Sequence, residues 1–333
     1  MVSPKRPLSP AALACGALLA LAAAALPAAS PLELTGMCDG SAAAPLDANH
    51  FAAADDERNL IAVYRRDRPG PPVFVKDMTD DLSIDPKNPE ADVEGAARVG
   101  DTIYWIASHG TNEKGKARPN RRRLFATRIA PGKGGWSISL RGTAYRRLVE
   151  DLTADDRLDR FDLARAAERP AKDPLALNIE GLAATPDGHL LIGFRCPIIG
   201  GKALLVPLEN PAALVDSGGP VRFGAPIELD LGGLGIRDIV LSESSGGYVI
   251  VAGPAGPEPG FSLFRWSGRP VDKPAPIPGA NLGDLRPEAV TVFPGTPGLL
   301  LLSDDGTRTA SGVECKDVEA TAERSFRMLW MEP

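Results

Sequence analysis

The sequence is poor in the residues from which metal sites and nucleophilic sites are most often built. It contains four cysteines and three histidines among 333 residues. No two cysteines have the CxxC spacing of a structural zinc site, and no Gly-x-Ser-x-Gly elbow marks a serine hydrolase. The glycine-rich segment 132–136 contains a lysine but lacks the spacing of a phosphate-binding P-loop. We therefore expect no nucleotide or organic cofactor.

Long apolar runs are also scarce, and the longest, at about residues 11–26, lies near the N-terminus. Lys5 and Arg6 precede it and small residues follow it at 27–30, which is the order of a secretory signal. We expect residues 1–30 to be a signal peptide that is cleaved near 28–30. The mature protein, residues 31–333, is then a single periplasmic or secreted domain without membrane attachment. An uncleaved membrane anchor is the alternative.

An excess of positive charge is absent. The formal net charge is −6, and loss of Lys5 and Arg6 with the signal peptide lowers it by two further units. An acidic chain is a poor candidate for binding nucleic acid or an anionic membrane. We interpret the basic run 121–123 as the solvated end of a loop.

Three cysteines remain after removal of the signal peptide. Cys38 and Cys315 lie near opposite ends of the mature chain, and an oxidising compartment would allow a disulfide between them if the two ends meet. Cys196 is then the odd thiol. A buried, inert thiol is the favoured interpretation, and a catalytic thiol is the alternative.

Long helical patterns are scarce, whereas glycine and proline are plentiful, with 35 and 32 residues. This composition indicates many short strands joined by tight turns. A repeated pattern consists of an acid, a short apolar strand, a turn rich in glycine, and a second apolar strand. The leading acids are separated by 55, 86, 58 and 50 residues. They are Asp39, Glu94, Glu180, Asp238 and Glu288.

A period near 50 residues with three or four strands per unit is typical of propeller blades. We predict an all-β fold, a β-propeller of five blades with about four strands each. The long gap contains the charged, Ala/Leu-rich segment 146–172, which predicts a short helical insertion; a degenerate sixth blade is the alternative. The segment 32–34 could supply the outer strand of the last blade and so close the ring.

Several motifs resemble a bacterial protein family of unknown function, DUF3616. They are Cys-Asp-Gly-Ser at 38–41, Val-Glu-Gly-Ala-Ala-Arg at 93–98, Tyr-Trp-Ile-Ala-Ser-His-Gly at 104–110, Arg-Pro-Asn-Arg-Arg-Arg-Leu-Phe-Ala at 118–126, Asn-Ile-Glu-Gly-Leu at 178–182, Gly-Lys-Ala-Leu-Leu-Val-Pro at 201–207 and Gly-Ile-Arg-Asp-Ile at 235–239. The resemblance extends over almost all of the mature chain. It implies a propeller-like fold and no established activity. The starts of the strands are also loosely similar to esterase-like phytase and lactonase propellers, a likeness at the level of the fold.

The repeat predicts which residues share one face of the ring. The second strand of a blade runs antiparallel to the first, so the start of the first strand and the end of the second lie together. The leading acids therefore converge at one rim of the central channel. They are joined there by residues at the ends of the second strands, in the loops that follow, and beside the leading acid of the fourth unit: Asp55, His109, Arg195, Asp304, Arg123, Lys202 and Arg237. Asp187, Gly188 and His189 belong to the turn at the opposite end.

A ring of carboxylates cannot stay ionised and unpaired, because repulsion and desolvation raise the pKa values. The rim therefore requires arginine partners or a hard cation such as Ca²⁺ or Mg²⁺, for which we propose Asp39, Glu94, Glu180, Asp238 and Glu288 as ligands. The structural alternative is that each acid accepts backbone N–H groups of the neighbouring blade and helps to seal the ring.

Two functional hypotheses follow from this rim. In the first, the chain is a metal-dependent hydrolase of a phosphoester, ester or lactone, in which Glu94, His109 and Glu180 act in catalysis. The remaining polar residues would bind a small anionic molecule: Asp55, Arg123, Arg195, Lys202, Arg237 and Asp304. In the second, the same rim binds a ligand or a partner loop without turnover. In either case we expect a monomer.

Overall fold

The computed structural model describes residues 1–2, 30–133, 135–256, 258–310 and 312–332. The predicted signal peptide, residues 1–30, therefore lies almost entirely outside the described residues. Among the described residues, no helix has the length and apolar character needed to cross a membrane.

Five four-stranded antiparallel sheets form the blades of a β-propeller within the described part of the chain. Blade 1 contains β2 (Ala42–Pro45), β3 (His50–Asp55), β4 (Leu60–Arg65) and β5 (Phe74–Asp77); blade 2 contains β6 (Val93–Val99), β7 (Thr102–Ala107), β8 (Leu124–Gly132) and β9 (Gly135–Tyr145); blade 3 contains β10 (Asn178–Ala184), β11 (Leu190–Cys196), β12 (Ala203–Leu208) and β13 (Ile227–Leu229); blade 4 contains β14 (Gly235–Ser242), β15 (Gly247–Gly253), β16 (Ser262–Trp266) and β17 (Ala275–Pro276); blade 5 contains β18 (Pro287–Val292), β19 (Leu299–Ser303), β22 (Ser325–Met331) and β1 (Leu32–Thr35). The predicted fold and the number of strands per blade are confirmed.

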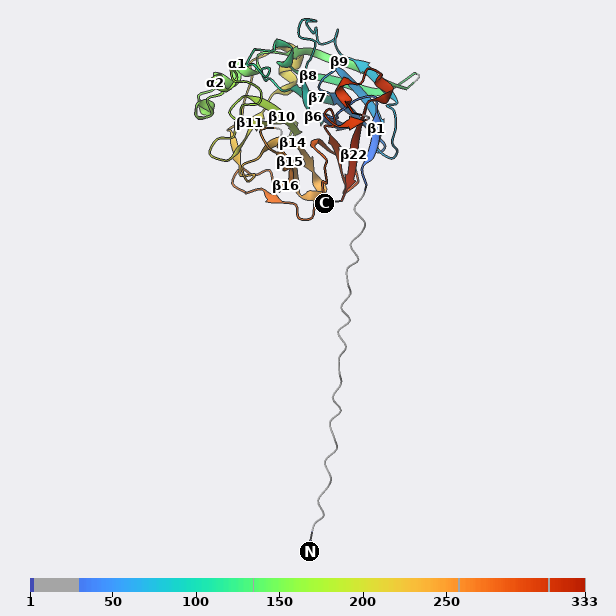
Figure 1. Ribbon diagram of the computed structural model, residues 1–333. Helices are drawn as coiled ribbons and strands as arrows, with labels where there is room; N and C mark the ends of the chain where they lie inside the picture. Colours follow the sequence, from blue (N-terminus) through green and yellow to red (C-terminus); the bar gives the residue numbers. More distant parts are fainter. Residues whose placement is uncertain (3–29, 134, 257, 311, 333) are drawn as a thin grey trace.

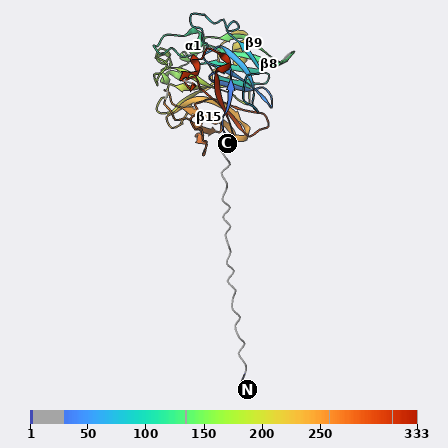
Figure 2. The same cartoon turned by 45° about the vertical axis from the view of Figure 1, so that its right-hand side comes forward.

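The first strands of the blades surround the centre of the ring. Figure 1 shows β6, β10 and β14 near the middle, with the later strands of each blade farther out. Turned by 45°, the molecule shows β15 across the ring from β8 and β9 (Figure 2).

The ring closes through the N-terminal strand. β1 pairs antiparallel with β22, from Leu32 opposite Met328 to Thr35 opposite Ser325, and completes blade 5. A disulfide joins Cys38 to Cys315 across 277 residues of sequence. Both features follow from the meeting of the chain ends that the sequence suggested. β1 is the outermost strand of blade 5, so the last blade is completed by the start of the chain and the ring is closed.

The hydrophobic core is divided among the five junctions between neighbouring blades. Blade 5 meets blade 1 around Phe51, Tyr64, Phe293 and Phe326, for example, and separate clusters occupy the other four junctions. Each sheet is therefore covered on both faces. This explains why an inner strand such as β19 is a continuous apolar run rather than an alternating one.

The predicted insertion is helical. It contains α1 (Leu148–Thr153), the 3-10 helix η2 (Asp156–Phe161) and α2 (Leu163–Ala166). Leu148, Leu152 and Phe161 pack into the cluster between blades 2 and 3, so the long gap extends this junction and holds no sixth blade. The remaining elements are η1 (Pro119–Arg121), α3 (Pro211–Ser217), η3 (Glu243–Ser245), β20 (Thr309–Ala310), β21 (Val313–Glu314), η4 (Cys315–Asp317) and η5 (Thr321–Glu323).

Candidate functional site

A β-bulge lies near the start of the first strand in blades 2 to 5. In each case the pairing with the second strand shifts by one residue, and the skipped residue is Glu94, Glu180, Arg237 or Glu288. A bulge turns a side chain out of the alternation of its strand and is often found beside functional sites. These four residues therefore occupy equivalent positions at one end of the central channel, which we call the acid end.

The bulges correct the predicted repeat in blade 4. The residue equivalent to Glu180 is Arg237, whereas the sequence analysis assigned Asp238 to that position. Matching the flanking apolar residues, Ile236 and Ile239, with Ile179 and Leu182 would have shown the correct register.

Asp238 has a structural task. It is 1% exposed, and its Oδ1 accepts a hydrogen bond of 2.8 Å from the Ile239 backbone N–H. Its Oδ2 accepts one of 2.7 Å from the N–H of Val290 in blade 5. Burial raises the pKa of this carboxyl, whereas the N–H donors, which include Leu182 in blade 3, act in the opposite direction. Asp238 thus joins neighbouring blades, as the structural alternative supposed, and we no longer propose it as a cation ligand.

One side of the acid end is neutralised by ion pairs. Arg195 Nη1 lies 2.8 Å from Glu180 Oε1, and Arg237 Nε lies 2.8 Å from Glu180 Oε2, the latter without hydrogen-bond geometry. Arg237 also contacts Glu288 through Nη2. The remaining donors of Arg195 include Nε and Nη2, which donate to the backbone oxygens of Pro254 and Gly256. We call Glu180, Arg195, Arg237 and Glu288 the paired half.

The other side is rich in carboxylates, and we call it the acidic half: Asp39, Asp55, Asp56, Asp92 and Glu94. One oxygen each of Asp39, Asp55 and Asp56 lie within 4.8 Å of one another, and the same is true of Asp56, Asp92 and Glu94. Asp56 therefore links the two groups.

Two of these acids form ion pairs with arginine. Arg58 binds Asp55 through Nε and Nη2, at 3.0 and 2.7 Å. Asp92 lies 3.0 Å from Arg121 Nη1 and accepts a hydrogen bond from the Ser108 hydroxyl. By contrast, Asp39 and Asp56 have no basic partner among the described residues, and their two carboxyls are close enough to share a proton.

The electrostatics of the acidic half disfavour full ionisation of its carboxyls. Burial raises the pKa values of Asp39, Asp56 and Glu94 well above the ordinary carboxyl range. Neighbouring carboxylates add to this effect, with Asp56 acting on Asp39 and Asp92 acting on Glu94. Ionisation of these carboxyls is therefore unfavourable unless a nearby positive charge offsets it. A set made only of carboxylate oxygens suits a hard cation such as Ca²⁺ or Mg²⁺.

Asp56 and Asp92 were not among the ligands expected from the sequence. Asp56 directly follows Asp55 at the end of a second strand, and Asp92 lies two residues before Glu94 at the start of the next unit. Carboxylates at these two kinds of position, in consecutive repeats, were the available signal. What the repeat did not show is that blades 1 and 2 bring them within a few ångströms of each other.

His109 is close in sequence to the acidic half but differs from the expected general base. It is 1% exposed, with a backbone φ of 57°, and its Nδ1 lies 2.6 Å from the Ala107 backbone oxygen, to which it donates. Burial lowers its pKa to about 4, and the charges of Arg122 and Arg123 act in the same direction. A buried neutral imidazole is a weak base at neutral pH, so this geometry argues against a catalytic role.

The remaining predicted ligand-binding residues, Arg123, Lys202 and Asp304, lie in different surroundings. Arg123 is 1% exposed and donates to the backbone oxygens of Leu82, Ser83, Pro119 and Asn120, which argues against binding of an external anion. Lys202 is exposed beyond the end of β11.

Asp304 is half-buried beside the acidic half. It forms an isolated backbone bridge with Asp39, and its Oδ1 accepts a hydrogen bond of 2.9 Å from the Gly306 N–H.

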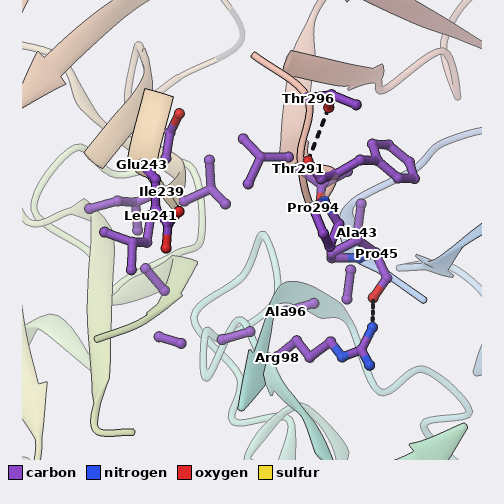
Figure 3. Close-up of a pocket in the computed structure, with 18 of the residues that line it drawn as sticks. Ala43, Pro45, Ala96, Arg98, Ile239, Leu241, Glu243, Thr291, Pro294 and Thr296 are labelled. Carbon is purple, nitrogen blue, oxygen red and sulfur yellow. Dashed lines mark hydrogen bonds between the residues drawn. The ribbon is translucent and has the colours of Figure 1, made fainter. Parts of the chain in front are cut away.

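The opposite end of the channel contains a pocket of about 650 Å³ (Figure 3). We call it the turn-end pocket because it adjoins the turns between first and second strands. Glu180 and His189 do lie at opposite ends of blade 3, as predicted, since Asn178 pairs with Cys196 and Ala184 pairs with Leu190. Only turn residues were expected at this end from the sequence, and the pocket was not predicted.

Comparisons with known proteins give only distant likenesses. No curated protein matches the chain. Similar solved structures include glutaminyl cyclase of Myxococcus xanthus, at 10% identity and a TM-score of 0.46, covering 90% of this chain and 94% of that one. A gluconolactonase of Xanthomonas campestris has 14% identity and a TM-score of 0.36, covering 91% and 80%. Virginiamycin B lyase of Staphylococcus aureus has 10% identity and a TM-score of 0.38, covering 91% and 99%.

These likenesses are too distant to carry an argument about activity. The family comparison agrees with the sequence motifs over part of the chain. Residues 137–277 match the family described as Protein of unknown function (DUF3616), which confirms the predicted family resemblance.

Proposed function

We propose that this chain is an exported propeller that binds a hard divalent cation, Ca²⁺ or Mg²⁺, in the acidic half of its channel. The bound cation would in turn bind a small anionic molecule. The observation that carries the proposal is the contrast between the two halves of the acid end. Glu180 and Glu288 each have an arginine partner, whereas buried oxygens of Asp39 and Asp56 have none within the described chain.

Asp56 is the proposed central ligand, because its carboxylate belongs to both groups of oxygens, with Asp39 and Asp55 on one side and Asp92 and Glu94 on the other. Asp55 and Asp92 contribute further negative charge and are held in place by Arg58 and Arg121. Asp56 and Asp304 are more exposed than Asp39, so they mark the side from which a ligand would enter. Glu180 and Glu288, which the sequence analysis also suggested as ligands, are engaged by arginine and support the rim from the other side.

Hydrolysis receives less support than binding. The residues expected to bind anionic oxygens, Arg195, Arg237 and Arg123, are engaged by carboxylates or backbone oxygens. His109, the expected base, is buried and neutral. The site therefore favours the second hypothesis, a binding module whose ligand recognition depends on a cation.

Calorimetric titration of chelator-treated protein with Ca²⁺ and with Mg²⁺ tests this proposal. We expect saturable binding near one ion per chain. Asp56→Asn should weaken it at least tenfold, because Asp56 belongs to both carboxylate groups. Asp187→Asn, the same chemical change in an exposed turn at the opposite end, should leave it unchanged. Absence of saturable binding in the parent protein, or equal binding by Asp56→Asn, would refute the proposal.

Turnover is tested on the same samples. Phosphoester, ester and lactone substrates should show no cation-dependent hydrolysis if the chain is a binding module. Hydrolysis that disappears in Asp56→Asn would instead support the hydrolase hypothesis while retaining the cation site.

A further inference from the structure

The disulfide between Cys38 and Cys315 lies beside the acidic half. Cys38 directly precedes Asp39, which is 2% exposed and belongs to the proposed cation site. Cys315 lies in the long connection between β19 and β22, whose described residues are 304–310 and 312–324 and which we call the strap. The bond therefore ties the strap to the chain immediately before a carboxylate of the site.

The first part of the strap packs against Asp39. Its Asp305 N–H donates to the Cys38 backbone oxygen at 3.1 Å, and Asp304 forms the isolated backbone bridge with Asp39. A Cβ atom placed on Gly306 would lie 3.9 Å from Asp39 Oδ2, so the glycine lets the strap approach the carboxylate closely. The backbone around Asp39 thus depends on where the strap lies.

The strap is itself anchored on both sides of these contacts. Arg327 of β22 binds Asp305 through Nε and Nη2, at 2.8 and 2.7 Å, which holds the start of the strap to blade 5. Beside the disulfide, the Lys316 N–H donates to the Gly306 oxygen at 3.1 Å. Cys38, by contrast, lies in the short connection between β1 and β2 and belongs to neither strand. The disulfide thus fixes this connection to an anchored part of blade 5.

Such support matters because the acids of the site repel one another when they are ionised. Asp39 lies beside Asp55 and Asp56, and it has no basic partner among the described residues. In the absence of a cation, repulsion favours conformations in which Asp39 moves away from Asp56. A disulfide that opposes this movement keeps the ligands close together before the cation arrives. Such preorganisation raises affinity, because less of the site must be ordered on binding.

We propose that the Cys38–Cys315 disulfide regulates the cation site: the acidic half binds Ca²⁺ or Mg²⁺ tightly while the bond is intact and more weakly once it is reduced. This inference rests on the proposed function, because it concerns the same carboxylates. The expected difference in affinity is about tenfold, toward the lower end of typical couplings between two sites.

A small dithiol is the class of reductant that would operate this switch. One of its thiolates attacks one cysteine sulfur, and the other cysteine leaves as a thiolate. Its second thiol then displaces the first cysteine from the mixed disulfide. Two electrons thus pass to the protein, the reductant becomes a cyclic disulfide, and its two protons end on the thiols of Cys38 and Cys315.

Calorimetric titration of chelator-treated protein with Ca²⁺ tests the proposal on variants. The double variant Cys38→Ser/Cys315→Ser should bind Ca²⁺ about tenfold more weakly than the oxidised parent. Leu34→Ala is the matched control, because Leu34 packs between blades 5 and 1 and its truncation weakens ring closure without removing the disulfide. This control and Cys196→Ser, which removes the buried free thiol, should keep the affinity of the parent protein. Circular dichroism confirms that each variant is folded.

The reciprocal effect is measured on the parent protein and needs no cysteine variant. If reduction weakens Ca²⁺ binding about tenfold, saturating Ca²⁺ should shift the reduction equilibrium of the disulfide toward the oxidised form by the same factor. Mixtures of reduced and oxidised dithiothreitol set this equilibrium, and alkylation followed by mass spectrometry gives the reduced fraction. Circular dichroism confirms that the reduced protein stays folded. At the same Ca²⁺ concentration, Asp56→Asn should show a smaller shift, because its cation site is impaired.

The outcomes separate this inference from the proposed function. Absence of saturable Ca²⁺ binding by the oxidised parent would refute the proposed function and this inference with it. Saturable binding by the parent together with equal affinity in the folded double variant, or with an equal loss in Leu34→Ala, would overturn this inference alone. So would a reduction equilibrium of the folded protein that Ca²⁺ does not shift, and this measurement decides the question if the double variant does not fold.

Discussion

Arg237 should stabilise the ring because it connects two blades through buried charges. Its side chain is 3% exposed and lies between Glu180 of blade 3 and Glu288 of blade 5, although Arg237 itself belongs to blade 4. Its guanidinium also lies over the Phe261 ring, 5.6 Å from the centroid. Substitution Arg237→Met would keep an extended side chain of moderate size and remove the charge. Glu288 would then be buried without its cation, and Glu180 would keep only Arg195.

Removing one partner of a buried ion pair typically costs about 3–5 kcal/mol, because the charge that remains is still desolvated. We expect a loss of this size in the free energy of unfolding of Arg237→Met. Glu288→Gln removes the charge that would be left uncompensated. The double variant should therefore be more stable than the sum of the single effects predicts, by about 1–3 kcal/mol.

Equilibrium denaturation of the parent, both single variants and the double variant gives this coupling energy directly. Arg65→Met is the matched control, because the Arg65–Asp67 pair lies at the surface and its loss should not change stability measurably. The reasoning fails if the Arg237 and Glu288 effects add to within about 0.5 kcal/mol, or if Arg237→Met is as mild as the control.

Two further predictions concern ring closure and the acidic half. Replacing Cys38 and Cys315 by serine opens a loop of 277 residues and should lower the free energy of unfolding by about 5 kcal/mol in the chain-entropy account; denaturation of the double variant beside the oxidised parent measures this, and an unchanged midpoint would contradict it. In the presence of a chelator, the folded protein should hold the protons of Asp39, Asp56 and Glu94 more tightly than the unfolded chain does. The stability that these protonated carboxyls contribute should therefore be present at low pH. It should be lost as the pH rises from about 4 toward their raised pKa values in the folded state. Denaturation at pH 5 and at pH 8 should show that the free energy of unfolding falls less between these pH values in Asp56→Asn than in the parent protein. Saturating Ca²⁺ should reduce the fall in the parent protein. Equal falls in the free energy of unfolding of parent and variant would count against the proposed role of Asp56.

The sequence was informative wherever the physical cause was local or periodic. Apolar runs separated by tight turns, repeated near every 50 residues, were enough to predict the five blades, the helical insertion and the closing strand. Antiparallel pairing of consecutive strands also placed Glu180 and His189 at opposite ends. These inferences hold because strand pairing between sequence neighbours depends on short stretches of chain.

Partner choice among the charged residues required the tertiary structure. Glu180 pairs with Arg237, which is 57 positions away in sequence, and the acidic half joins Asp39 and Asp56 of blade 1 to Glu94 of blade 2. A repeat pattern treats every blade alike, so it could not show that arginine pairs with the acids of one half of the rim and with only some acids of the other half. The repeat pattern also could not show that a one-residue bulge turns Arg237, rather than Asp238, toward the channel. A bulge changes which side chain faces the channel without interrupting the repeat.

From the sequence alone, then, come the fold class, the repeat and the end of the channel where the carboxylates gather, since these depend on local apolar periodicity and turn chemistry. The tertiary structure decided which carboxylates lack a basic partner, whether His109 is accessible, and that a pocket lies at the other end of the channel. Those properties arise from contacts between blades, where burial and distance are set by closure of the whole ring.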